Sequence, residues 1–243
     1  MAFVTLAGVA TFLLTCLVLG VRLLRRAFVT RQIPEFAAGS AFFLCGGMGY
    51  QLIVAARMVL TRSPVLGIVC YAAGLLCLNL GVACLALFVW QIFRPSPVGA
   101  LVFGMFSTAI VVGYVGLALE THFAALQARG LWGWVGALAR LGVFGWASAE
   151  SFRAYFRLRK LADPSDATLL RRLYWWGWGA GWATGIFVIA LLQQGTGTVD
   201  VRDPLFAIPT ACLGVVAAWC LWQAFYGVDG DGELLEIPHP RGD

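Results

Sequence analysis

The sequence predicts an all-α integral membrane protein, a bundle of seven transmembrane helices. The 243-residue chain is 60% hydrophobic and only 12% charged, whereas soluble domains carry about 25% charged residues. Residues 63–93 contain no charged side chain, and about 20 apolar residues are enough to span a bilayer as a helix. Six other stretches have the same character, so we expect residues 1–226 to form one membrane domain without a second, soluble one.

Charges and prolines bound the first three predicted spans. The stretch at residues 2–24 ends among three arginines. We expect it to be retained as a helix, because it lacks the basic start and the small-residue cleavage site of a signal peptide. Span 36–59 follows the turn at Pro34. Span 64–93 begins with Pro64, and proline suits the first turn of a helix.

Four further spans complete the bundle. Span 98–119 follows two prolines, and spans 131–155 and 173–193 flank an arginine-rich loop. Span 204–226 begins after an aspartate, a good helix cap, and starts with proline. The tail at residues 227–243 is rich in glycine, proline and acidic residues, which predicts a disordered cytoplasmic segment.

The basic residues of the short loops predict the orientation. Lysine and arginine concentrate in cytoplasmic loops, and here they gather after the first, third and fifth spans. We therefore expect the N-terminus outside, the C-terminus in the cytoplasm, and a multi-pass position in the cell (inner) membrane. The residues on the basic side are Arg22, Arg25, Arg26, Arg31, Arg94, Arg153, Arg157, Arg159, Lys160, Arg171 and Arg172.

Spans one to three and spans five to seven share an outline. Each triplet turns through a basic loop, returns on a glycine-rich helix, and crosses a loop ending in Arg-x-Pro, at Arg62–Pro64 and Arg202–Pro204. Parallel repeats are a common plan of transporters. Because glycine-rich helices are also ordinary in membranes, chance similarity remains the alternative to a three-one-three duplication.

Charged side chains deep in a membrane are candidates for function. Arg140 is the deepest, and it is a candidate for ligand binding or gating. The alternative is a structural role, either snorkelling toward the interface or pairing with Glu120 on the neighbouring span. Glu150 precedes Arg153 by three residues, a spacing that favours an ion pair on one helix face.

Several uncharged polar and aromatic residues also lie deep in the spans. With Arg140 we expect them to line a mostly apolar cavity that opens outward, as small-molecule sites commonly do, although each alone fits helix packing. Pro209 interrupts the last span and is a candidate hinge. The remaining ligand-binding candidates are Asn79, Tyr50, Gln51, Tyr71, Tyr114, Trp146 and Trp182.

Several function classes lack the residues they need. Span seven has no lysine for retinal, and the two histidines fall outside the spans. Seven cysteines without a CxxC spacing indicate neither a disulfide framework nor a zinc site. We therefore predict no catalytic residue, metal or cofactor. We also predict no nucleic-acid partner, because the arginines sit at helix ends.

Three functions remain open. The leading hypothesis is a sensor or receptor-like protein that binds a small apolar ligand from outside and signals through a cytosolic partner. The first alternative is a small-solute carrier with the three-one-three helix repeat. The second is an accessory subunit whose partners are other membrane proteins.

Overall fold

The computed structural model describes residues 2–59, 62–123, 130–161, 167–196 and 204–226, with side chains from residue 8 onward except Val9. These residues form helices joined by short turns, so the all-α prediction is confirmed for the described parts of the chain. The elements are α1 (Ala2–Thr30), α2 (Ile33–Phe42), the π-helix η1 (Phe43–Gly49), α3 (Tyr50–Val59), α4 (Pro64–Phe93), α5 (Pro97–Thr121), α6 (Leu131–Arg159), α7 (Ala167–Thr196) and α8 (Pro204–Phe225).

The helices extend beyond several of the predicted spans. α1 continues to Thr30, α6 continues to Arg159, and α7 begins at Ala167. The reason is that the apolar stretch marks the thickness of a bilayer, whereas arginine is itself a good helix former. A helix therefore continues through its flanking basic residues until the chain must turn.

The second span contains a π-helical segment that the sequence analysis did not predict. α2, η1 and α3 follow one another without a break, and η1 covers residues 43–49. Here the chain packs closely on α4: a Cβ at Gly49 would lie 2.8 Å from the Leu78 nitrogen. A Cβ at Gly74 would lie 2.9 Å from the Gly49 oxygen. Small residues at such positions let membrane helices approach.

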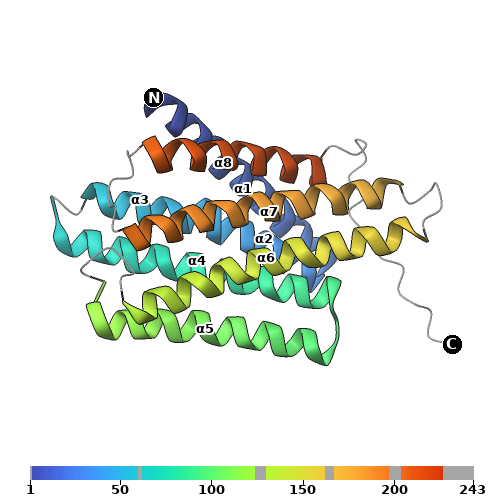
Figure 1. Ribbon diagram of the computed structural model, residues 1–243, viewed down its shortest axis with the longest axis horizontal. Helices are drawn as coiled ribbons and strands as arrows, with labels where there is room; N and C mark the ends of the chain where they lie inside the picture. Colours follow the sequence, from blue (N-terminus) through green and yellow to red (C-terminus); the bar gives the residue numbers. More distant parts are fainter. Residues whose placement is uncertain (1, 60–61, 124–129, 162–166, 197–203, 227–243) are drawn as a thin grey trace.

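Six helical segments form a closed ring, and α5 lies outside it. In order around the ring, α1 packs on α2 and η1, these pack on α4, α4 on α6, α6 on α7, α7 on α8, and α8 on α1. α5 contacts α4 and α6. Figure 1 shows the helices side by side along the long axis, with α5 at the lower edge and α8 near the upper one.

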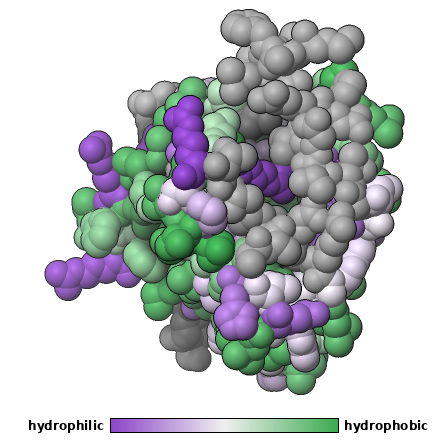
Figure 2. Space-filling model, turned by 90° about the vertical axis from the view of Figure 1, so that its left-hand side faces the viewer, coloured by the Kyte–Doolittle hydropathy of each residue, from purple (hydrophilic) through white to green (hydrophobic). Residues whose placement is uncertain are grey.

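The bundle has two ends, which we call the Arg57 end and the Arg94 end. At the Arg57 end, on the left of Figure 1, α1 and α8 begin and α3 and α7 end. At the Arg94 end, α1, α4 and α6 end and α5 begins. Figure 2 views the Arg57 end, where hydrophilic side chains stand among apolar ones.

Within the described residues, five helical segments are long and apolar enough to cross a membrane: Ile33–Val59, Pro64–Phe93, Pro97–Thr121, Ala167–Thr196 and Leu205–Phe225. Large apolar side chains on their outer faces are exposed, among them Val65, Leu101 and Leu119. This composition fits an integral, multi-pass membrane protein. α6 is absent from the five, and it is the helix that carries Arg140, Glu150 and Arg153.

Candidate functional site

A cavity of about 360 Å³ lies inside the helix ring. All six segments of the ring contribute to its lining, whereas no described residue of α5 does. Most of the lining is apolar, and the polar side chains are few. Those polar side chains are Tyr50, Arg57, Tyr71, Arg140, Gln193, Gln194 and Thr210.

Arg140 is the buried one of the two arginines that line this cavity. Its side chain is buried, at 8% exposure, and Nη1 donates a 2.8 Å hydrogen bond to Asn79 Oδ1 on α4. Gly136, one turn earlier on α6, leaves room for the guanidinium, because a Cβ there would lie 3.3 Å from Nη1. The bond to the equally buried Asn79 fixes the guanidinium at the α4–α6 contact.

The electrostatic surroundings of Arg140 are unusual for a buried cation. Tyr71 and Cys45, which also line the cavity, have side chains that are ordinarily neutral near pH 7. No carboxylate lines the cavity or forms an ion pair with Arg140 among the described residues. Two arginines, one from α3 and one from α6, therefore add positive charge to an otherwise apolar cavity.

The structure brings four of the eight predicted ligand-binding residues together. Tyr50, Tyr71 and Arg140 line the cavity, and Asn79, which does not line it, accepts a hydrogen bond from Arg140. Arg140 thus bonds an amide rather than reaching Glu120. Glu120 is exposed, and its carboxylate lies against Gly130.

The expectation that the other four candidates line the same cavity is wrong. Gln51 is exposed, and the Tyr114 hydroxyl donates to the Ala72 carbonyl at 3.2 Å. Trp146 packs on Phe106. Trp182 stacks on Trp178, with ring centroids 5.7 Å apart. Their depth along a span stays a prediction, and their helix faces turn them away from this cavity.

Other cavity residues were missed by the sequence analysis. Trp176 lines the cavity, and so do Phe42, Phe144 and Gln193. A signal was present for Gln193, because it adjoins a second glutamine at the end of an apolar stretch. The aromatic residues carry no such signal, since phenylalanine is common on every face of a membrane helix.

An aromatic cluster closes the cavity toward the Arg94 end. The rings of Phe42, Trp176 and Phe225 contact one another edge to face, with centroids 5.5–5.8 Å apart. Phe88 of α4 adds a contact with Trp176 at 5.4 Å. Phe42 and Trp176 also line the cavity, so this cluster forms its floor.

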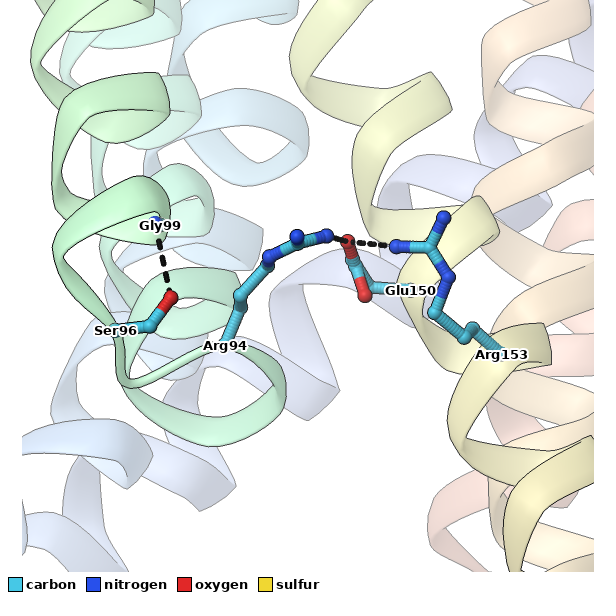
Figure 3. Close-up of polar contacts among 5 residues, drawn as sticks. All are labelled: Arg94, Ser96, Gly99, Glu150 and Arg153. Atoms are coloured by element: carbon cyan, nitrogen blue, oxygen red, sulfur yellow. Dashed lines mark hydrogen bonds and ion pairs between the residues drawn. The ribbon is translucent and has the colours of Figure 1, made fainter.

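Beyond the floor, a three-residue ion cluster joins α4 to α6. Glu150 Oε1 accepts hydrogen bonds from Arg94 Nη1 at 2.8 Å and from Arg153 Nη1 at 2.7 Å. Figure 3 shows the two arginines approaching the carboxylate from opposite sides. Ser96, two residues after Arg94, accepts a hydrogen bond from Gly99 N–H and caps the start of α5 (Figure 3). Arg94 is a partner that sequence spacing did not indicate, since it lies 56 residues away.

Two more contacts join helices at the same end. Arg26 forms a 2.7 Å ion pair with Glu35 between α1 and α2. The Arg22 guanidinium lies 4.2 Å from the Tyr226 ring centroid, between α1 and the end of α8. The candidate hinge Pro209 lies inside α8, which remains helical on both sides, and its ring is exposed.

Comparison of the chain with protein-family models, curated proteins and solved structures found no match.

Proposed function

We propose that the protein is a membrane carrier for a small, largely apolar solute, with seven spans, the N-terminus outside and the C-terminus in the cytoplasm. The Arg57 end would then face outward and the Arg94 end inward. The positive-inside rule supports this orientation, because the basic loops gather at the Arg94 end.

The observation that carries the proposal is the arrangement of the ring as two three-helix units. The first unit is α1, the segment α2–η1–α3, and α4; the second is α6, α7 and α8. In each unit the middle member contacts both others, while α1 does not contact α4 and α6 does not contact α8 within the described residues. Each unit's last helix meets the first helix of the other, at α4–α6 and α8–α1.

A parallel repeat with α5 as the connecting helix would give this arrangement. In transporters built from repeats, the solute site lies between the two units, and one unit rocks against the other. The cavity here has that position, because both units contribute lining residues and α5 does not.

The contacts at the Arg94 end also support a carrier. Arg94 and Glu150 join the units at α4–α6, and Arg22 and Tyr226 join them at α1–α8. Both interfaces between the two units therefore have a side-chain contact at the Arg94 end, beyond the aromatic cluster. Breaking these ties would let the units separate there, which is the movement that alternating access requires.

Cysteine accessibility tests the proposal without knowledge of the solute. Single cysteines are introduced into a variant lacking the seven native ones, at Ala41, which lines the cavity, and at Ala147, which is fully buried elsewhere. A membrane-impermeant maleimide is applied to right-side-out and inside-out vesicles. We expect Ala41→Cys to react from both sides and Ala147→Cys from neither.

Glu150→Gln provides the second arm of this experiment. By removing the tie between α4 and α6, it should increase labelling of Ala41→Cys from the cytoplasmic side. Labelling from the outside alone, with and without Glu150→Gln, would contradict alternating access. That result would instead favour the receptor hypothesis, since a receptor needs its cavity open on one face.

A further inference from the structure

We infer that the cavity binds a small organic anion, an oxyanion on an apolar body, with the oxyanion on Arg140. This inference names the solute class for the proposed carrier and rests on that function only for the transport step, because binding can be measured by itself.

No carboxylate among the described residues compensates the charge of Arg140. A cation in a membrane helix is costly, and such residues pair or face a functional cavity. Arg140 is buried and lines the cavity, yet its hydrogen-bond partner is the neutral amide of Asn79. An anion in the cavity would supply the countercharge that the described residues do not.

The guanidinium of Arg140 has more hydrogen-bond donors than the bond to Asn79 uses. A guanidinium has five N–H groups in a fixed fork, and Asn79 accepts from one nitrogen, Nη1. Oxyanions accept two parallel hydrogen bonds from such a fork. Asn79 thus orients the guanidinium without occupying it, as a pre-organised binding group requires.

A second arginine, Arg57, adds positive charge to the cavity lining. Arg57 is exposed at the end of α3, and both Arg57 and Arg140 line the cavity. Charges of one sign at a narrow opening raise the local concentration of the opposite ion. The same two arginines would repel an organic cation.

The rest of the lining selects the body of the ligand. Phe144, Trp176 and Phe187 line the cavity together with aliphatic side chains. An alkyl or aromatic group would fill this part, since small-molecule sites combine an apolar wall with a few placed polar groups. A volume of about 360 Å³ is near the lower end of such sites, so the ligand is small.

Equilibrium binding of radiolabelled octanoate tests the inference. The full-length protein is placed in nanodiscs of zwitterionic phosphatidylcholine, with empty nanodiscs as the background. Octanesulfonate, octanol and octylammonium compete as probes of equal chain length. We expect both anions to bind at least tenfold more tightly than octanol, because a charged hydrogen bond is lost with the alcohol, and octylammonium to compete most weakly.

Three variants locate the oxyanion. Arg140→Gln should weaken octanoate binding at least tenfold, whereas Arg140→Lys, which keeps the charge, should weaken it less. Arg57→Gln changes an exposed residue and should weaken binding mildly and reduce its salt dependence. Arg153→Gln, at the ion cluster beyond the floor, should leave octanoate affinity unchanged.

Two results would overturn the inference. One is equal affinity of the wild-type protein for octanol or octylammonium and octanoate, which does not depend on any variant folding. The other is unchanged octanoate affinity in a correctly folded Arg140→Gln protein. Displacement of octanoate by added phosphatidylglycerol would support the oxyanion site and assign it to a lipid headgroup. If the protein binds the anion but Ala41→Cys is not labelled from both sides, the carrier proposal is refuted and the inference of an anion site is kept.

Discussion

The ion cluster around Glu150 gives the most quantitative prediction for stability. The Glu150 side chain is 6% exposed, while Arg94 and Arg153 are 38% and 49% exposed. Glu150→Gln keeps the shape of the side chain but removes the charge that both arginines share. We expect the free energy of unfolding to fall by about 2 kcal/mol.

The magnitude follows from two opposing effects. Hydrogen bonds to charged groups contribute roughly 1.5–3 kcal/mol each, and Glu150 accepts two. Part of this loss is offset, because burying a carboxylate is itself costly and the glutamine variant no longer bears that cost. Both arginines are partly exposed and regain water, which further limits the cost.

Arg153→Gln is the matched control for Glu150→Gln. It removes one half-exposed partner and leaves the Arg94–Glu150 bond in place, so it should cost less than about 1 kcal/mol. The assay is SDS-titrated unfolding of the purified protein, followed by tryptophan fluorescence. If Glu150→Gln costs no more than Arg153→Gln, the carboxylate does not join α4 to α6 as argued here.

Three further predictions concern packing, the cavity and orientation. Gly49→Ala should destabilise the protein by about 1–3 kcal/mol through overpacking on α4, whereas Gly104→Ala, where a Cβ meets no atom within 4 Å, should be neutral or stabilising in the same unfolding assay. Trp176→Ala should change octanoate affinity because Trp176 lines the cavity, and Trp182→Ala should not; equal effects of the two would contradict the assigned cavity wall. A fluorescent protein fused after the C-terminus should fold and fluoresce in the cytoplasm, while alkaline phosphatase fused there should be inactive; the reverse pattern would refute the proposed orientation.

Much of the fold could be predicted from the sequence because a bilayer leaves few choices. A long stretch without charges, such as residues 63–93, must satisfy its backbone hydrogen bonds internally, and within one chain segment only a helix does so. Helix starts at Pro64 and Pro204 were also readable, since proline lacks the donor that a first turn leaves unused. The π-helical turn at η1 had no comparable signal.

The candidate site was predicted less completely, because the sequence does not determine the direction in which each residue faces around its helix axis. Sequence position sets how deep a residue lies, because each residue advances a helix by about 1.5 Å. It does not set which way the residue faces when every face of the helix is apolar. Tyr71 and Tyr114 were both read as deep, yet Tyr71 lines the cavity and Tyr114 bonds a neighbouring backbone.

By itself, then, the sequence determined the helical class of this protein and predicted a lipid solvent and a deep position for Arg140, because those follow from local composition and from the cost of charge in hydrocarbon. The tertiary structure alone decided that α4 brings Asn79 to Arg140 and Arg94 to Glu150. Those pairs lie 61 and 56 residues apart in the chain. Their meeting depends on which helices become neighbours in the ring, and that is set by the packing of all six segments together.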